Sequence, residues 1–276
     1  MAGSPRPSIA LTIAGSDSGG GAGIQGDLKT FSALGVYGAS VVTAITAQNT
    51  RRVSAQERVS PALIAAQIDA VLGDLDVAAI KIGMLGDAEV IATVAGRLRA
   101  HLADRPRPVV LDPVMVAKSG DALIAPDAVA ALVELMLPLA TILTPNLPEA
   151  ARLLGCAPAA DAEGMRAQGR ALLTLGPAHV LMKGGHARGA ECTDLLIGPE
   201  PLELRAPRRA TANTHGTGCA LSSAIAAGLA QGMATGPALR RAHGWLQGAI
   251  AAADALGVGL GHGPVDHFHA LRGRAA

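Results

Sequence analysis

Short apolar runs rich in β-branched residues alternate along this chain with longer segments of helical periodicity. Strands that alternate with helices of ten or more residues require crossover connections, which build a mainly parallel sheet covered on both faces. The sequence therefore predicts an α/β fold, a three-layer sandwich around one central sheet. Strands are expected at 8–14, 36–45, 78–82, 108–112, 141–144 and 178–183, a hairpin at 191–205, and helices at 24–34, 61–72, 87–102, 126–137, 147–154, 161–175, 216–232 and 236–256.

Nothing in the sequence divides the chain into separate parts. There is no long linker, shift in composition or tandem repeat, so we expect a single domain over residues 1–276, with 1–8 as a flexible N-terminus. A chain of 276 residues is long enough to bury a large core without disulfides. Cys156, Cys192 and Cys219 are odd in number and lack metal-ligand spacing, which is typical of a reduced, intracellular protein.

The charge balance and the hydropathy exclude several classes of protein. The chain has 23 basic and 22 acidic residues, and no basic block that would suit a nucleic acid or an anionic membrane surface. Hydrophobic residues make up 50% of the chain, which excludes a disordered protein. No apolar run reaches the ~18 residues of a membrane-spanning helix. We therefore expect a cytoplasmic protein whose partners are small molecules, not nucleic acids or membranes.

Most of the unusual residues lie in loops that directly follow predicted strands. In a parallel sheet these loops converge on the edge formed by the carboxyl ends of the strands, where ligands of open α/β sheets bind. We therefore expect one ligand site at this edge. The loops concerned are 15–23, 46–50, 83–86, 112–121, 144–149 and 183–189.

The first of these loops is a glycine cluster that extends from Gly15 to Gly26. Its G-x-G-x-x-G portion, 21–26, fits the dinucleotide-binding pattern, but two features exclude that interpretation. The pattern does not follow the strand directly, and no acidic residue occurs in 43–56, where a ribose-binding carboxylate is expected. A turn whose backbone approaches a small ligand and a plain flexible turn both stay open.

A second glycine-rich turn, His215-Gly-Thr-Gly-Cys219, runs directly into an apolar helix. The free N–H groups and the dipole of a helix N-terminus favour an anion, so this turn is a candidate phosphate site formed without a lysine. No Walker A pattern occurs in the sequence. An ordinary capped turn would have the same residues, so both interpretations stay open.

Four polar side chains follow other predicted strands. Asp112 ends a buried strand, where a carboxylate is either a loop cap or a site group. Asn146 and Glu149 stand three residues apart at a helix start, which suits either a helix cap or a ligand site. Lys183 precedes a glycine turn and could meet phosphates or only solvent. Their expected convergence on one edge of the sheet favours a site.

Taken in order, eight segments resemble the hydroxymethylpyrimidine/phosphomethylpyrimidine kinases of thiamine biosynthesis, which belong to the ribokinase-like superfamily. The resemblance extends from Ile9 to about Leu271 and depends on the order and spacing of the segments. The segments are GSDSGGGAGIQGDLKTF, TAITAQNT, KIGML, VLDPVMVAKSGD, TPNLPEA, VLMKGGH, NTHGTGCALSSAIA and GHGPVDHFHA.

The resemblance implies a homodimer that transfers two phosphoryl groups from ATP with Mg²⁺, first to the hydroxymethyl group of an aminopyrimidine and then to the monophosphate. It implies a catalytic turn over Gly216, Thr217 and Gly218, with Cys219 in place of the aspartate that serves most ribokinase-like enzymes as base. It further implies a pyrimidine pocket of Gly15, Asp27, Gln48, Met84, Val114 and Cys219, nucleotide contacts from Asn146, Lys183 and Thr217, and a Mg²⁺ site at Asp112 and Glu149, direct or through water.

Two alternative functions stay open. A pyridoxal or pyridoxine kinase of the same superfamily shares the anion turn and also phosphorylates a hydroxymethyl group on a nitrogen heterocycle, whereas a pyrimidine-binding regulator would have lost catalysis. Gln48 within T-A-Q-N favours the pyrimidine, and an intact turn together with Asp112, Glu149 and Lys183 argues against lost catalysis. His243 stands where the family often has a lysine, so that lysine's nucleotide contact is not carried over.

Overall fold

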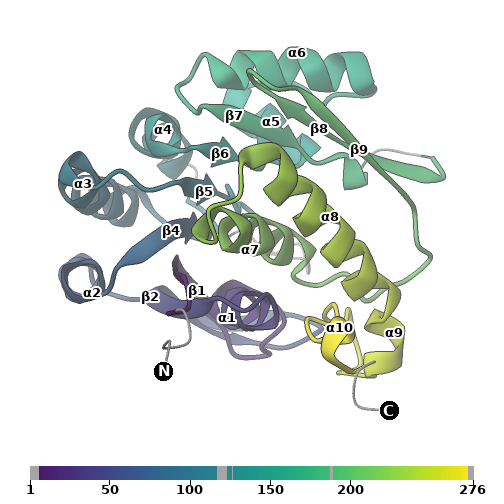
Figure 1. The fold of residues 1–276 in the computed structure, drawn as a ribbon, viewed down its shortest axis with the longest axis horizontal. Coiled ribbons are helices and arrows are strands. Elements are labelled where there is room, and N and C mark those ends of the chain that lie inside the picture. The colour runs from purple at the N-terminus through teal and green to yellow at the C-terminus, as the bar shows by residue number, and fades with distance from the viewer. Residues whose placement is uncertain (1–5, 117–122, 126, 187–188, 273–276) are drawn as a thin grey trace, which may run out of the picture.

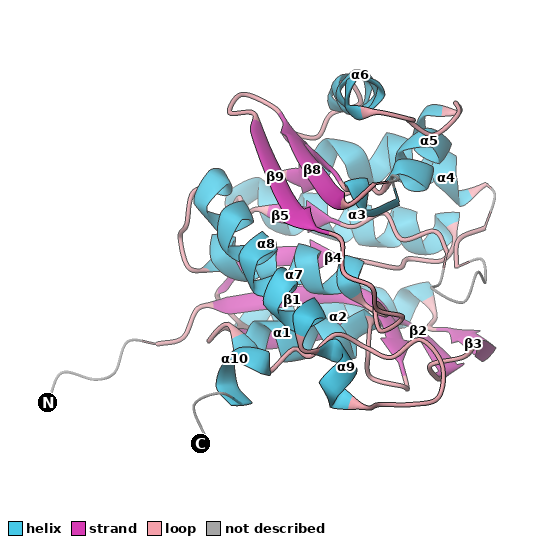
Figure 2. Ribbon diagram, turned by 90° about the vertical axis from the view of Figure 1, so that its right-hand side faces the viewer, coloured by secondary structure: helices cyan, strands magenta, loops and turns pink. Residues whose placement is uncertain are grey.

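One sheet runs through the whole described part of the chain. The structure, a computed structural model, describes residues 6–116, 123–125, 127–186 and 189–272. The strand order is β3-β2-β1-β4-β5-β6-β7-β8-β9, and Figure 2 shows the sheet with the β8–β9 hairpin at the top and β2 and β3 at the bottom. The strands are β1 (Ile9–Asp17), β2 (Tyr37–Gln48), β3 (Val53–Arg58), β4 (Val77–Ile82), β5 (Val109–Leu111), β6 (Ile142–Leu143), β7 (His179–Met182), β8 (Glu191–Ile197) and β9 (Leu202–Pro207).

The strands between β2 and β7 pair in parallel, and antiparallel strands close both edges of the sheet. At one edge β3 pairs with β2, and at the other the hairpin of β8 and β9 pairs with β7. The predicted mainly parallel sheet and the predicted hairpin are confirmed. The single domain stays a prediction that one continuous sheet favours, and of its flexible segment 1–8 residues 1–5 lie outside the described ones.

Helices cover both faces of the sheet, as predicted. One face carries α2 to α6, and the other carries α1, α7 and α8, of which α7 and α8 cross in front of the sheet in Figure 1. The helices are α1 (Gly23–Ala33), α2 (Pro61–Asp74), α3 (Ala88–Asp104), α4 (Ala128–Ala131), α5 (Leu147–Leu154), α6 (Ala162–Leu173), α7 (Thr217–Ala230), α8 (Thr235–Ala251), α9 (Ala253–Leu256) and α10 (His269–Arg272). α4 continues into a π-helical turn over Leu132–Met136 and a 3-10 turn over Leu137–Leu139, and a further 3-10 turn, Gly184–His186, follows β7.

Successive residues of the parallel strands point to opposite faces, so each strand contributes to two cores. In β1, Leu11 and Ile13 belong to the core beneath α2 to α6, and Ala10 belongs to the core beneath α1, α7 and α8. In β5, Leu111 and Val110 divide in the same way. Burial on both faces explains why these strands are continuous apolar runs rather than alternating ones.

Side chains satisfy free N–H groups at the starts of two helices on one face of the sheet, α2 and α3. The Ser60 side chain accepts the Leu63 N–H and Pro61 takes the first position of α2, as the sequence predicted. Asp87 caps α3 in the same way, because its carboxylate accepts the Val90 N–H at 2.9 Å. These caps are local in sequence, so the starts of both helices could be predicted from it.

The strand β2 departs most from its prediction. It continues to Gln48 rather than ending at 45, and β3 was not predicted because its residues are mostly exposed and polar. Three residues of β1, 14–16, lie beside four residues of β2, 42–45, so β2 contains a bulge of one residue. The bulge inverts the order of buried and exposed side chains, so the apolar pattern breaks near the predicted end.

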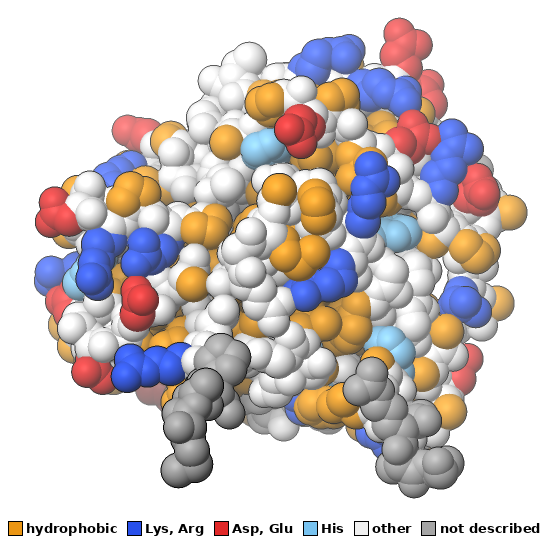
Figure 3. Space-filling model, viewed as in Figure 1, with side chains coloured by type: hydrophobic (Ala, Val, Ile, Leu, Met, Phe, Trp, Pro, Cys, Tyr) orange, Lys and Arg blue, Asp and Glu red, His pale blue; other side chains and the backbone are white. Residues whose placement is uncertain are grey.

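Two features of the described residues concern membrane spans and surface charge. Within the described residues, no helix combines the length and the apolar character needed to cross a bilayer. On the face seen in Figure 3, acidic and basic side chains are interspersed, and neither sign gathers into a patch. Exposed large apolar side chains include Tyr37 and Ile45 on β2 and Leu63 on α2.

Candidate active site

A cavity of about 570 Å³ opens at the carboxyl edge of the sheet, where the sequence predicted a site. Its walls come from the ends of β1 and β2, from loops after β4 to β7, and from the first turn of α7. The volume lies in the range of pockets for small organic ligands. The predicted site residues that line it are Gly15, Gln48, Met84, Asp112, Val114, Asn146, Glu149, Lys183, Gly216, Thr217, Gly218 and Cys219. The structure therefore brings together every predicted site residue except Asp27.

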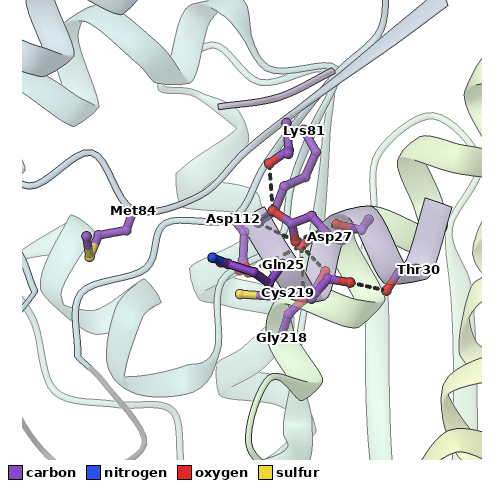
Figure 4. A network of polar contacts seen from close by, with 12 residues as sticks. Gln25, Asp27, Thr30, Lys81, Met84, Asp112, Gly218 and Cys219 are labelled. Atoms are coloured by element: carbon purple, nitrogen blue, oxygen red, sulfur yellow. Dashed lines mark hydrogen bonds and ion pairs between the residues drawn. The ribbon is translucent and has the colours of Figure 1, made fainter. Parts of the chain in front are cut away.

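Asp27 lies beneath the cavity and is fully buried. Its carboxylate accepts hydrogen bonds from Lys81 Nζ at 2.9 and 3.0 Å, from Thr12 Oγ1 at 2.6 Å and from Ser223 Oγ at 2.7 Å (Figure 4). These donors occupy both oxygens. The prediction that Asp27 binds the pyrimidine directly is therefore corrected: α1 turns this side chain toward the sheet, away from the ligand space.

Lys81, the partner of Asp27, forms part of the cavity floor without exposure to solvent. Burial alone would lower the pKa of its ammonium group, but Asp27 outweighs burial and, with smaller help from Cys219 and Asp112, holds this pKa above its ordinary value. Lys81 is therefore charged at neutral pH. The Lys81–Asp27 pair puts a fixed dipole directly beneath Cys219 and Asp112.

A second lysine, Lys183, lies in the cavity itself, directly after β7. Its Nζ donates to Asp112 Oδ1 at 2.8 Å and lies 3.8 Å from Glu149 Oε2. Burial raises the pKa of Asp112 and lowers that of Lys183, but their mutual attraction outweighs burial, so both groups are charged. Asp112 also accepts hydrogen bonds from Thr144 and Ser222, at 3.2 and 3.3 Å. One cation thus faces two carboxylates.

Asn146 and Glu149 form a reciprocal capping box at the start of α5. The Asn146 N–H donates to Glu149 Oε2 at 2.7 Å, and the Glu149 N–H donates to Asn146 Oδ1 at 2.9 Å. Asn146 and Glu149 therefore serve as a helix cap and also line the candidate ligand site, because the cap holds both side chains in the cavity wall. Burial chiefly, together with the charge of Asp112, raises the pKa of Glu149 to about 7, against the opposing effect of Lys183.

The glycine turn before α7 presents N–H groups to the cavity. Gly216 takes a left-handed conformation, with φ of 80°, and its missing side chain leaves the helix start uncapped. The N–H groups of Gly218 and Cys219 belong to the first turn and have no acceptor within the helix. A Cβ atom on Gly218 would lie 3.4 Å from both Asp112 Oδ2 and Lys183 Nζ. The turn can therefore receive an anion directly beside the charged cluster of Lys183, Asp112 and Glu149.

Cys219 lies where the first turn of α7 meets the cavity floor (Figure 4). Burial raises the pKa of its thiol to about 11; Lys81 and the Gly23 N–H oppose this rise, whereas Asp27 and Asp112 add to it. The helix N-terminus therefore does not produce a thiolate at neutral pH. As a resting base, Cys219 is not supported, and a neutral thiol in contact with the ligand fits its surroundings better.

A further part of the cavity lining consists of a glycine, an amide and two apolar side chains. Gly15 leaves space at the end of β1, and a Cβ atom there would collide with the methyl group of Met84. Gln48 projects from the end of β2, where its Oε1 accepts a weak hydrogen bond from Thr46 Oγ1 at 3.2 Å. Val114 completes this part of the lining. An amide and two apolar side chains suit a flat heterocycle with ring nitrogens.

Four charged or titratable cavity residues were not predicted as site residues: Asp17, Lys81, Arg152 and His215. Lys81 had a readable signal, because a lysine in an otherwise apolar strand requires a buried partner. Asp17 and His215 lie within or beside the two glycine clusters, where the glycines were singled out instead. His243 is buried on α8 and is not among the cavity residues, so it takes no part in this lining.

Comparison with known proteins agrees with this geometry. The family described as phosphomethylpyrimidine kinase matches residues 17–266. The hydroxymethylpyrimidine/phosphomethylpyrimidine kinase of Rhizobium meliloti is 58% identical over 95% of this chain and 97% of its own. A crystal structure of phosphomethylpyrimidine kinase from Clostridium difficile is 44% identical, with a TM-score of 0.77 over 88% of this chain and 99% of its own.

A pyridoxal kinase is also structurally close. The ADP complex of Bacillus subtilis pyridoxal kinase is 34% identical, with a TM-score of 0.87 over 97% of this chain and 99% of its own. These likenesses confirm the ribokinase-like architecture expected from the sequence. Because the family match covers nearly all of the chain and the identities are this high, the chain belongs to the phosphomethylpyrimidine kinase family.

Proposed function

We propose that this protein is an ATP-dependent kinase that phosphorylates 4-amino-5-hydroxymethyl-2-methylpyrimidine and then its monophosphate, in thiamine biosynthesis. The observation that carries this proposal is that one cavity holds an uncapped glycine turn, Lys183 and two carboxylates together with Gln48 and Met84. The cationic and anion-binding groups suit phosphates, and Gln48 with Met84 suits a small heterocycle. Family membership supports the same activity.

The charge and the position of each residue indicate its role in catalysis or binding. Phosphoryl transfer passes through a loose transition state, so positioning and charge stabilisation contribute most of the catalysis. The N–H groups of the Gly216–Gly218 turn would receive the transferred phosphoryl group, and Lys183 would neutralise charge that develops on it. Gln48 and the Cys219 thiol would hold the pyrimidine, with Asn146 and Thr217 near the nucleotide. Asp27 would act only from beneath, by fixing Lys81.

Mg²⁺ is proposed as the metal, and the donor set fits it. Mg²⁺ in kinases is held by one or two carboxylates together with substrate phosphates and water. Asp112 and Glu149 supply two buried carboxylates beside Lys183, and burial chiefly, with the charge of Asp112 in addition, raises the pKa of Glu149. These two residues would hold the ion, directly or through water, and Mg²⁺ would neutralise charge on the phosphates when bound.

The assay that tests the proposal is ATP consumption that depends on hydroxymethylpyrimidine, with Mg²⁺ supplied. ATP turnover that is independent of the pyrimidine, or no turnover, would contradict the proposed activity and would favour a binding protein. The matched control is Lys183→Met, which leaves the pyrimidine wall intact. Both products should form in sequence, the monophosphate before the diphosphate.

A second candidate substrate is pyridoxal. It is favoured by the likeness to the ADP complex of Bacillus subtilis pyridoxal kinase. We expect a higher kcat/KM for hydroxymethylpyrimidine than for pyridoxal, measured on the same preparation. The reverse order would make pyridoxal the main substrate of the same cavity.

The assembly and the compartment are proposals as well. We expect a homodimer in the cytoplasm, where ATP is supplied, because kinases resembling this one usually assemble in pairs. Tyr37, Ile45 and Leu63 are exposed apolar side chains that a second copy would bury. Light scattering after size-exclusion chromatography gives the mass, and a monomer at micromolar concentration would contradict the dimer.

A further inference from the structure

Asp17, the last residue of β1, holds the first glycine turn. The side chain is almost fully buried, with 3% of the residue exposed. Oδ1 accepts the Gly19 N–H at 2.8 Å, and Oδ2 accepts the N–H groups of Gly21 and Ala22 at 3.1 and 2.9 Å. Three backbone donors on one carboxylate fix this turn at the entrance of α1.

Asp17 also contacts the second glycine turn, 198 residues further along the chain. His215 Nε2 lies 2.8 Å from Asp17 Oδ2 and is the donor, because an ionised carboxylate can only accept. Burial would raise the pKa of Asp17, but His215 and the backbone donors outweigh it and hold this pKa below its ordinary value. The backbone of His215 is fixed from the other side, where its N–H donates to the Gly263 carbonyl at 3.1 Å.

The two turns pack closely because Gly21 and Gly216 have no side chains at the contact. A Cβ atom on Gly216 would collide with the carbonyl oxygen of Gly21, and one on Gly21 would collide with the ring of His215 and lie 3.0 Å from Pro264 Cβ. A shift of one turn must therefore move the other. The Asp17–His215 hydrogen bond is the polar link across this contact.

The geometry points to Asp17 as a positioning residue for phosphoryl transfer: through His215 it aligns the Gly216–Gly218 turn with the rest of the cavity. The inference depends on the proposed function, which assigns the phosphoryl group to the N–H groups of that turn. Hydrogen-bond donors stabilise a transition state only when they are already in place, so small displacements are costly. Asp17 is not a catalytic residue in this scheme, because it acts through His215.

The test compares replacements on both sides of the hydrogen bond. In His215→Leu the donor is lost while Asp17 keeps its three backbone partners; in His215→Gln the side-chain amide can still donate to Asp17. We expect His215→Leu to lower kcat on both acceptors by on the order of 10- to 100-fold, with KM changed less than threefold. His215→Gln should recover most of kcat. Asp17→Ala should lower kcat at least as far as His215→Leu, and the double variant no further than Asp17→Ala.

The control is Asp266→Asn, which alters a buried carboxylate of the neighbouring loop that lies outside the cavity lining. It should leave kcat unchanged. Equal losses in His215→Leu and His215→Gln, additive losses in the double variant, or full activity in Asp17→Ala would each overturn the inference. The last of these, together with a slow His215→Leu, would mean that His215 acts on the ligand itself.

Hydrogen exchange tests the coupling of the two turns without an activity measurement. It therefore separates this inference from the proposed function and also reveals whether a variant is poorly folded. Peptides that cover 18–22 and 214–220 are followed in the unmodified protein and in His215→Leu. Faster exchange in both peptides supports the coupling of the two turns, even if the unmodified protein proves inactive and the proposed function fails. Unchanged exchange in both would overturn the coupling, whatever the activity.

Discussion

Lys81, which is buried, and Lys183, which is half-buried, are both charged and both held by an aspartate, yet their surroundings differ. Lys81 and Asp27 have no exposed side-chain surface, and both oxygens of Asp27 are filled by protein donors. Lys183 has 13% of its side chain exposed, faces two carboxylates and borders the glycine turn. We call Lys81 with Asp27 the closed pair, and Lys183 with Asp112 and Glu149 the open cluster. The closed pair can only stabilise the fold, whereas the charged groups of the open cluster can still contact a ligand.

Replacing each lysine with methionine tests this difference, and we expect the largest loss of stability at Lys81. Lys81→Met strands a buried carboxylate, so we expect it to lower the free energy of unfolding by about 3–5 kcal/mol. Urea unfolding followed by circular dichroism measures this loss. A change below about 1 kcal/mol would mean that water or a rearrangement solvates Asp27.

A double replacement sharpens the same point. Asp27→Leu combined with Lys81→Met removes both charges, and apolar replacement of a buried pair is often close to neutral in stability. We expect the double variant to recover more than half of the stability lost in Lys81→Met. No recovery would show that the hydrogen bonds of Thr12 and Ser223, not the charge, hold this region.

Lys183→Met should give the opposite pattern. The Asp112 carboxylate keeps Thr144 and Ser222, and Glu149 can take up a proton, so the fold should lose less stability than in Lys81→Met. The lost charge in the cavity should lower kcat by about 10²–10³-fold. Steady-state kinetics and urea unfolding on the same preparation measure both. Equal profiles for the two lysine variants would remove the distinction between the closed pair and the open cluster.

The open cluster also predicts that stability depends on pH. The pKa of Glu149 is raised from 4.5 to about 7, so the folded chain binds this proton more tightly than the unfolded chain. The contribution to stability is complete below pH 4.5 and is lost as the pH rises through about 7. Glu149→Gln should flatten this fall in a series of urea unfolding curves, and the control Glu200→Gln, at an exposed position, should not.

The smallest change in catalytic rate is expected on replacing Cys219. With a pKa of about 11 the thiol is neutral, so Cys219→Ala should slow both transfers by similar factors of less than tenfold. Single-turnover rates for each acceptor measure this, with Cys192→Ala as control. A selective loss of 10²–10⁴-fold in the first transfer alone would restore the thiol as a base.

The order of strands and helices was readable because its signals are local. Alternating apolar runs and caps such as Ser60 lie within a few residues of the elements that they define. The charged cluster was readable in part, since Asp112, Glu149 and Lys183 each follow a strand of one parallel sheet. What the resemblance could not supply was the direction of individual side chains, which depends on the packing of distant elements.

Asp27 illustrates that limit, although the spacing of residues in α1 indicated a buried side chain rather than one that contacts the ligand. Ile24, Asp27 and Phe31 are spaced three and four residues apart, so they share the face of α1 that packs on the sheet. A carboxylate on that face needs a buried cation, and Lys81 in an apolar strand is the counterpart. Asp17 and His215 had no such signal, because 198 residues separate them.

The one-residue bulge in β2 decides which side chains of the strand face the cavity. Thr46 and Gln48 line the cavity only because the extra residue beside Gly15 changes the phase of the strand. Deleting Ala44 would remove the bulge, and regular alternation would then keep Thr46 and Gln48 on the cavity side, with β2 in register with Ser16 and Asp17 of β1. A regular strand that kept all its residues would instead turn Ile45, Ala47 and Asn49 to the cavity side, so a change of substrate preference in this fold need not begin with any substitution.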